Sequence, residues 1–441
     1  MRDRKLLILF LITLVFGFSV IGWYFFKATN KADPTLAVPT DPFGSAEDVV
    51  RGSEFVTGGN NPNGSENTSE RIPASERVFA EVWNKPVGGH AFVTREVFVE
   101  VFSTSTPAGS TSTVTTSRAV KQTVEYLLFV DRITGYLYGY DPLDGAVFQI
   151  TNTTTPGIYD AYITKNGTEV YMRSLAEDEI TIQTLVATIP SFIKGADAQA
   201  LTNIRSLQSN VSSFAVSETS NLVSYVVPTS LGSSIYSTNA KGTTSVSNSP
   251  FKEWSVLYGG ETPYITTKPS AYLEGNTLSL PNQNFALGNK TGLMTLPHKD
   301  GDLFLASMWS RAGLAAFVFS KKTGAQTILD ERTLASKCAW GYQTKIICGV
   351  PTTIPSTQDG LPDEWFRGSV SFSDNFYLME GDQGADEAGG STLIFALNEQ
   401  AGQPFDVIKP VVNKNSTSLS FVNKRNGSLW FLYLSRLPIE E

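Results

Sequence analysis

The sequence predicts an all-β protein, a seven-bladed β-propeller behind one N-terminal transmembrane helix. Three observations predict it. The chain starts with a long uncharged apolar run, short apolar or alternating runs then recur between turn residues, and only 17% of the 441 residues are charged. Globular domains usually carry about a quarter of charged residues. Here Ser, Thr, Asn and Gly take their place, which favours exposed β-structure joined by turns.

The first element is the apolar run over residues 6–26, which contains no charged residue. At ~1.5 Å per helical residue it reaches roughly 30 Å, the thickness of a bilayer's hydrocarbon core. Three cations within residues 1–5 precede it, so the positive-inside rule places that N-terminus in the cytoplasm and everything after Lys27 outside. The lipid bilayer is therefore an expected partner. The alternative, a cleaved signal peptide, would have an apolar core of about 7–15 residues.

The second element, residues 27–74, is expected to be a flexible tether. It is rich in Asp-Pro, Gly and Asn and shows no apolar periodicity. Such a segment buries too little surface to offset its ordering entropy. As a flexible coil of ~5–6 Å × √n it would span some tens of ångströms.

Residues 75–441 are expected to form the propeller. Apolar runs are paired around turns such as Asn166-Gly167, Asp300-Gly301 and Asn426-Gly427, which is typical of hairpins. The hairpins recur every 40–80 residues or so, the spacing of four-stranded blades. A pair of β-sandwiches is the alternative. Blades are predicted to start near Gly89, Ile158, Val211, Phe251, Gly292, Lys337 and Asn415.

The last predicted blade lacks a strand, because the chain after Asn415 has room for only three. The segment Arg77–Trp83 has the composition of a strand and no partner in its own neighbourhood. We expect it to complete the last blade and close the ring. Closure would remove the open sheet edges that otherwise template aggregation.

The two cysteines, Cys338 and Cys348, are predicted to form a disulfide. A five-residue loop, Gly341–Lys345, places them opposite each other in a hairpin. Facing Cβ atoms lie ~4.5–5.5 Å apart, which is close enough to bridge. An oxidising compartment outside the cytoplasm fits this pairing. A redox switch and a metal site are the alternatives, although two sulfurs without a nearby His make an incomplete metal shell.

No catalytic residue, cofactor or metal ligand is predicted. His90 and His298 are the only histidines, both in turn-like settings, and no Gly-x-Ser-x-Gly elbow is present. The acidic segment Glu380–Glu387 does not have EF-hand spacing. The net charge of −8, without a basic stripe to neutralise phosphates, argues against nucleic acid as a partner.

Trp365 and Phe366 are the candidate binding surface. They lie in a segment expected to be a long loop, after Pro355 and Pro362. Exposed aromatic side chains on a propeller face are suited to binding a sugar or a partner protein. The alternative is that they pack between blades.

Particular motifs add a resemblance to a known family. The hairpins resemble those of the WD-repeat and TolB-like propeller superfamily, without the Gly-His and Trp-Asp marks of true WD repeats. More narrowly, the chain is similar over most of its length to uncharacterised bacterial membrane-anchored propellers. The motifs that carry this likeness are Cys338-Ala339-Trp340, Ile347–Pro351, Leu361–Gly368, Ser371–Asp374 and Gly427–Trp430. The resemblance implies an architecture and carries no known activity.

We therefore expect a membrane-anchored, extracytoplasmic propeller that acts as a protein-binding or scaffold module at the cell envelope. Its partner would be an unknown envelope protein or a glycan. The alternative is an envelope glycan hydrolase or a carbohydrate-binding propeller. A hydrolase should show a deep central funnel with paired carboxylates of raised pKa, whereas a scaffold should show a shallow face with aromatic residues.

Overall fold

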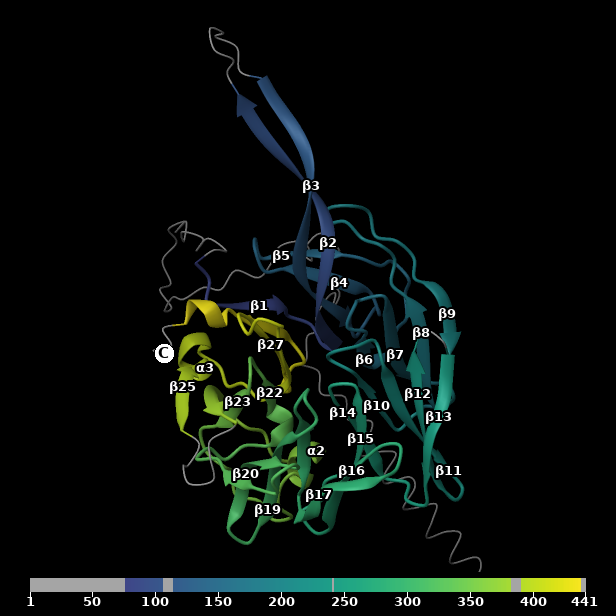
Figure 1. The fold of residues 1–441 in the computed structure, drawn as a ribbon, viewed down its shortest axis with the longest axis vertical. Helices are drawn as coiled ribbons and strands as arrows, with labels where there is room; N and C mark the ends of the chain where they lie inside the picture. Colours follow the sequence, from purple (N-terminus) through teal and green to yellow (C-terminus); the bar gives the residue numbers. More distant parts are fainter. Residues whose placement is uncertain (1–75, 106–113, 240–241, 382–389, 438–441) are drawn as a thin grey trace, which may run out of the picture. The chain divides into compact units, whose positions relative to one another are not determined.

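The computed structural model describes residues 76–105, 114–239, 242–381 and 390–437. Within these ranges the chain forms seven four-stranded antiparallel sheets, which are arranged as blades around a central axis (Figure 1). The predicted seven-bladed all-β propeller is confirmed. The predicted transmembrane helix and tether, residues 6–26 and 27–74, lie outside the described residues. Among the residues that are described, no helix is both long and apolar enough to cross a bilayer.

The first six blades each take four consecutive strands. Blade 1 comprises β2 (Val87–Ser105), β3 (Val114–Asp131), β4 (Leu137–Asp141) and β5 (Ala146–Gln149). Blade 2 comprises β6 (Ile158–Ile163), β7 (Glu169–Leu175), β8 (Ile182–Thr188) and β9 (Thr202–Ser206). Blade 3 comprises β10 (Ser213–Val216), β11 (Val223–Thr229), β12 (Gly232–Asn239) and β13 (Gly242–Ser249).

Blade 4 comprises β14 (Trp254–Gly259), β15 (Thr262–Thr267), β16 (Glu274–Ser279) and β17 (Asn284–Thr291). Blade 5 comprises β18 (Met294–Pro297), β19 (Leu303–Ser310), β20 (Gly313–Ser320) and β21 (Gln326–Ile328). Blade 6 comprises β22 (Cys338–Trp340), β23 (Lys345–Pro351), β24 (Asp374–Glu380) and β25 (Ser391–Phe395). Among the described residues, four short helical segments lie outside the sheets: η2 (Ala335–Lys337), α2 (Asp363–Arg367), α3 (Leu397–Ala401) and η3 (Leu434–Arg436).

Blade 7 is built from both ends of the propeller. Its strand order is β1 (Phe79–Trp83), β28 (Leu429–Leu432), β27 (Leu419–Asn423) and β26 (Val407–Val412). Phe79 pairs with Leu432 in register, so the N-terminal strand lies beside the C-terminal strand. The predicted ring closure by Arg77–Trp83 is confirmed.

The predicted start of the last blade, Asn415, is wrong because β26 precedes it. The bulge between Ile408 and Val411 interrupts the alternation of this strand. Pro410 lies in that bulge, the position at which a sheet tolerates proline. These two features hide the strand from a search for regular alternation. The other six predicted starts fall within a few residues of the observed first strands.

The core lies between neighbouring blades. Because central strands are covered on both sides, they are continuously apolar, as in the fully buried segment Leu127–Val130 of β3. Val93 of blade 1 packs in one cluster with Ile158 and Met172 of blade 2. At the closure, the Phe79 ring stacks on Trp430 with their centroids 4.8 Å apart. Closure of the ring therefore buries aromatic surface as well as pairing backbone.

Blade 1 carries a long hairpin. β2 and β3 stay paired from Val87 opposite Asp131 to Ser105 opposite Val114, whereas β4 pairs only with Leu127–Val130. The hairpin therefore continues beyond the other strands of its blade and projects away from the ring (Figure 1).

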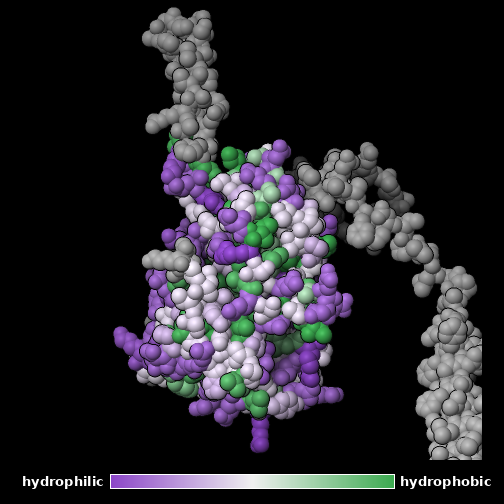
Figure 2. Space-filling view, turned by 90° about the vertical axis from the view of Figure 1, so that its right-hand side faces the viewer, coloured by the Kyte–Doolittle hydropathy of each residue, from purple (hydrophilic) through white to green (hydrophobic). Residues whose placement is uncertain are grey.

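The ring has two faces, which the strand order defines. We call the end at which the second and third strands of each blade connect the 2–3 face, and the opposite end the 1–2 face. The first strand of each blade starts at the 2–3 face, opposite its connection to the second strand. Trp83 lies a few residues before the start of β2, the first strand of blade 1, so Trp83 lies at the 2–3 face. Phe79, at the other end of β1, lies at the 1–2 face. From the side, the surface is mostly polar and shows apolar side chains in small groups (Figure 2).

Candidate functional site

The predicted binding residues Trp365 and Phe366 lie at the 2–3 face, in the connection of residues 352–373 between β23 and β24. This connection is not the plain loop that was expected, because it contains the short helix α2. Gly368 ends the helix in the left-handed region, at φ +77°, and its N–H donates to Trp365 O. Such a C-cap favours glycine because a Cβ is strained there.

The two aromatic residues have different surroundings. The side chain of Trp365 is only 3% exposed, so it does not contribute to an exposed surface. It packs between blades, which was the alternative reading. Phe366 is 53% exposed. One turn of helix thus fixes one aromatic residue in the interior and presents the next to solvent.

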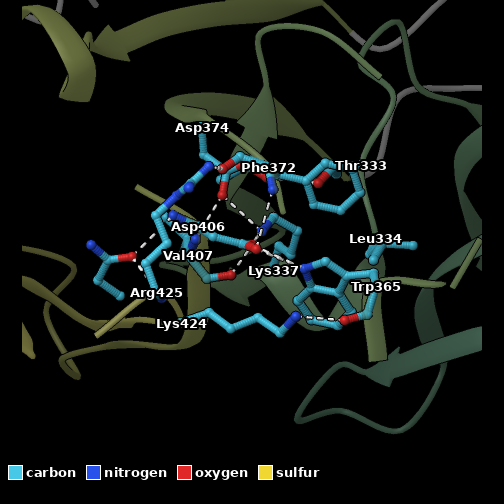
Figure 3. Close-up of polar contacts among 12 residues, drawn as sticks. Thr333, Leu334, Lys337, Trp365, Phe372, Asp374, Asp406, Val407, Lys424 and Arg425 are labelled. Carbon is cyan, nitrogen blue, oxygen red and sulfur yellow. Dashed lines mark hydrogen bonds and ion pairs between the residues drawn. The ribbon is translucent and has the colours of Figure 1, made fainter. Parts of the chain in front are cut away.

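Trp365 covers a buried polar cluster, which Figure 3 shows. Lys337, at the end of η2, is fully buried and forms ion pairs with two fully buried carboxylates. Its Nζ lies 2.7 Å from Asp374 Oδ2 and 2.5 Å from Asp406 Oδ1. Nζ also donates to the carbonyl of Val407 at 2.9 Å. We call Lys337, Asp374 and Asp406 the lysine cluster.

Both carboxylates of the lysine cluster accept further hydrogen bonds. The indole Nε1 of Trp365 donates to Asp406 Oδ1 and Oδ2, at 3.1 and 3.0 Å, and the Phe372 N–H donates to Asp406 Oδ2 at 3.2 Å. The Val407 N–H donates to Asp374 Oδ2 at 2.6 Å. The rings of Trp365 and Phe372 cover Lys337, with centroids 5.2 and 4.9 Å from Nζ.

The lysine cluster pairs one ammonium with two carboxylates in a dry environment. Burial raises the pKa of Asp374 to about 6, although Lys337 acts in the opposite direction. Asp374 Oδ1 makes no hydrogen bond in the structure. A carboxyl pair of this kind is what a glycosidase requires, but a glycan cannot reach side chains that are fully buried.

The exposed part of the connection is tied to blade 4. Asp359 forms an ion pair with Arg367, with 2.6 Å between Oδ2 and Nη2, and accepts a hydrogen bond from the Tyr272 hydroxyl at 3.1 Å. The Ala271 N–H donates to Asp363 Oδ2 at 2.5 Å. Residues 268–273, between β15 and β16, therefore lie beside α2 on the 2–3 face.

Three large apolar side chains are exposed here. Tyr272 is 67% exposed, Leu273 70% and Phe366 53%. We call these three residues the aromatic platform. The hydrogen bond from Arg367 lowers the pKa of Asp359, and the hydrogen bond to Asp359 raises the pKa of Tyr272. Because all these groups are exposed, solvent screens their interactions.

The connection that carries Phe366 has a buried, hydrogen-bonded support. Glu364 is buried and accepts hydrogen bonds from the N–H groups of Gln358 and Asp359, at 2.6 and 2.5 Å. Gly360 packs directly on blade 5, where a Cβ would lie 2.6 Å from Trp309 Nε1. The connection thus contacts blades 4 and 5 and inserts Trp365 into blades 6 and 7.

The predicted disulfide is present. Cys338 in β22 and Cys348 in β23 are direct partners in register and are joined by a disulfide. Both residues are buried. The bridge links the first two strands of blade 6, and Cys338 directly follows Lys337 of the lysine cluster.

His90 is not in a turn, contrary to expectation, but inside β2. Gly88-Gly89 resembles a turn signal, yet these glycines allow close packing, since a Cβ at Gly89 would lie 1.9 Å from Ala161 O. Burial, and after it the charge of Lys409, lowers the pKa of His90 to about 3. The His298 ring Nε2 lies 2.9 Å from Gln343 O, and burial lowers the pKa of His298 as well.

A second polar network, which sequence reasoning missed, joins blades 7, 1 and 2. The Nζ of Lys409 donates to Gly88 O at 2.9 Å and to Asp160 Oδ1 at 2.7 Å. Asp160 Oδ2 accepts from Arg173 Nη1 at 3.0 Å and from the Tyr162 hydroxyl at 2.8 Å. Lys409 and Asp160 are 249 positions apart, so no local sequence signal connects them.

Comparison with known proteins finds only distant similarities. No protein-family model and no curated sequence matches the chain. Among solved structures, the β-propeller domain of the trilobed protease from Pyrococcus furiosus is similar over 70% of this chain and 91% of its own, with 9% identity and a TM-score of 0.45.

Two further solved structures show a similarly low resemblance. Hydrazine synthase from Kuenenia stuttgartiensis matches over 65% of this chain and 79% of its own, with 12% identity and a TM-score of 0.42. The Cps50 (Swd1) propeller domain from Myceliophteria thermophila matches over 70% and 93%, with 7% identity and a TM-score of 0.40. Likenesses this distant carry no functional argument.

Proposed function

We propose that this protein is a single-pass, membrane-anchored propeller of the bacterial cell envelope, with residues 6–26 in the bilayer, a cytoplasmic N-terminus and an extracytoplasmic propeller that binds another envelope protein. The observation that carries the binding role is the aromatic platform. Phe366 lies on a helix with a buried, hydrogen-bonded support, and the Tyr272 hydroxyl is hydrogen-bonded to Asp359 beside that helix. Rigid aromatic anchors are typical of the energetic centres of protein interfaces.

The position of the platform supports this role. Phe79, the first residue of β1, lies at the 1–2 face, whereas α2 and residues 268–273 lie at the 2–3 face. A tether before Phe79 would join the ring on the side away from the platform. The platform of an anchored protein would then be free to meet a partner.

The hydrolase alternative has less support. The paired carboxylates of a hydrolase would have to reach the substrate, whereas Asp374 and Asp406 are fully buried around Lys337. Carbohydrate binding without hydrolysis is favoured by one observation, the exposed ring of Tyr272 beside the polar pair Asp359–Arg367. Aromatic rings bordered by hydrogen-bonding groups suit sugars as well as proteins.

The test is photo-crosslinking in intact cells. A photoreactive amino acid would replace Phe366 in one variant and Leu231 in a matched control, since Leu231 is 88% exposed on the β11–β12 connection of the same face. We expect a discrete protein adduct at position 366 and none at 231. Equal adducts at both positions would contradict the platform as a binding site, and an adduct whose added mass is removed by glycosidases would favour the glycan alternative.

The same cells test the orientation. Protease added to intact spheroplasts should digest the region after Lys27, because the proposed anchor leaves that region outside. Full protection of the region would overturn the extracytoplasmic placement.

A further inference from the structure

We propose that Lys337 and Asp406 become joined by an intramolecular isopeptide bond, with Asp374 as the proton-relaying residue. This inference concerns a covalent modification of the lysine cluster and does not depend on the proposed binding function. It rests on the geometry, burial and hydrogen bonding of these three residues (Figure 3).

The reacting groups are already in contact. Lys337 Nζ lies 2.5 Å from Asp406 Oδ1, and both side chains are fully buried. Their surroundings leave them little freedom, since Nζ also donates to Val407 O and lies under the rings of Trp365 and Phe372. Fixed contact of this kind replaces a bimolecular encounter and gives effective molarities on the order of 10⁵ M or more.

The bond forms without any co-reactant. The ammonium of Lys337 first gives a proton to Asp374, and the neutral amine attacks Asp406 Cγ. The Nζ–Cγ bond forms and the Cγ–Oδ1 bond breaks. Oδ1 leaves as water with two of the three protons that the ammonium carried, one of them passed on by Asp374. The third proton stays on the amide nitrogen, and Asp374 ends as it began.

The cluster stabilises the charge that develops on the way. When the amine attacks Cγ, negative charge gathers on Asp406 Oδ2. That oxygen already accepts hydrogen bonds from Trp365 Nε1 at 3.0 Å and from the Phe372 N–H at 3.2 Å. Two donors fixed before the reaction are the arrangement of an oxyanion hole, which is most effective where water is excluded.

Asp374 is suited to the relay. Its Oδ2 contacts Lys337 at 2.7 Å, while its Oδ1 makes no hydrogen bond and is free to carry a proton. Burial raises its pKa, which makes the protonated form accessible near neutral pH.

The product relieves a buried charge. Taking an ammonium and a carboxylate out of water carries a large desolvation cost, which their mutual attraction only partly offsets. An amide between Lys337 and Asp406 would be neutral and would leave only Asp374 as an ionisable group of the cluster. The same environment that destabilises the ions therefore favours the bond.

Mass spectrometry of the full-length protein tests the proposal. After reduction of the disulfide, a tryptic digest should contain a branched peptide that joins Lys337 to Asp406 and is lighter by one water than the sum of its two parts. Trypsin should no longer cleave after Lys337. Recovery of the peptide that ends at a free Lys337, from folded protein, would overturn the proposal and leave an ion cluster only.

Variants separate the roles of the residues. Lys337→Arg removes the nucleophile and should abolish the branched peptide. The matched control, Lys424→Arg, should retain it. Lys424 contacts the Trp365 ring and donates its hydrogen bond to the Trp365 carbonyl, not to either carboxylate of the cluster. Asp374→Asn should yield folded protein without the bond. A branched peptide that persists at full yield in Asp374→Asn would overturn the relay.

Discussion

His90 lies inside β2 with both ring nitrogens buried, where a positive charge would be poorly solvated. Lys409, which reaches across from blade 7, adds an unfavourable like charge. The neutral imidazole is therefore the form that the folded propeller holds. Side chains such as this one connect the stability of the whole ring to pH.

We predict that acid destabilises the protein partly through His90. The pKa of His90 is lowered to about 3 in the folded state, whereas the same histidine in the unfolded chain has its ordinary pKa near 6.5. Between these values the unfolded state binds a proton that the folded state does not, so the free energy of unfolding should fall as pH drops from about 6.5 towards 3. Denaturant titrations at several pH values should show a shallower fall for His90→Gln.

An equal slope in both proteins would show that His90 does not titrate as described. His298→Gln serves as a second comparison, because burial lowers the pKa of His298 in the same direction. The double variant should show a smaller fall in the free energy of unfolding at acid pH than either single variant.

At this scale, local pairs were predictable and distant ones were not. Cys338 and Cys348 face each other across one short hairpin, so spacing alone predicts their bridge. Trp365 is placed by Asp406, 41 positions away, and by Lys337 beneath its ring. No periodicity in a single sequence reports such a contact, so the sequence predicts the burial of Trp365 only as an alternative.

Among the elements, the connection of residues 352–373 has the greatest influence on the candidate site. Its Gly360 packs against Trp309 of blade 5, and its Asp363 accepts a hydrogen bond from the Ala271 N–H of blade 4. Hairpins were predictable because turn residues and alternation are local. The helix α2 and the strand β26 were missed, the first because it is only one turn long and the second because of its bulge at Pro410.

We predict that Gly360→Ala destabilises the protein and disturbs the aromatic platform. Gly360 has φ +84°, and an added Cβ would also lie 2.6 Å from Trp309 Nε1 and 2.9 Å from Ala271 Cβ. Backbone strain and the clash together should cost roughly 1–3 kcal/mol, measured by urea denaturation.

Gly313→Ala is the matched control, because Gly313 has φ +97° but nothing lies within 4 Å of its built Cβ. The control should show only the backbone cost of about 1 kcal/mol. If both variants lose the same stability, the close approach of the connection to blade 5 is not what holds it.

Across the whole molecule, the ring is closed by one N-terminal strand. β1 pairs with β28 along its length, and Phe79 packs against Trp430 and Phe421. Without β1, the backbone edge of β28 would be open and an aromatic cluster uncovered. The seven-fold count followed from the recurrence of hairpins, since each blade repeats one local unit.

We predict opposite outcomes for two truncations. Deletion of residues 1–73 should leave the melting temperature of the propeller unchanged, because β1 is retained. Deletion of residues 1–86 removes β1, and it should lower the melting temperature sharply or cause aggregation through the open edge. Differential scanning calorimetry compares the two, and equal melting curves would mean that β1 does not hold the ring closed.

The position of β1 in the chain also determines when the protein can finish folding. Of the strands in the described propeller, β1 is the first to be synthesised and its partner β28 the last. Blades 1 to 6 can assemble in turn as the chain emerges, but blade 7 has to wait until the final strand arrives. For as long as synthesis is under way, β1 remains without its partner and the ring stays open. A chain that is cut short before Leu429 can therefore complete six blades and still never close.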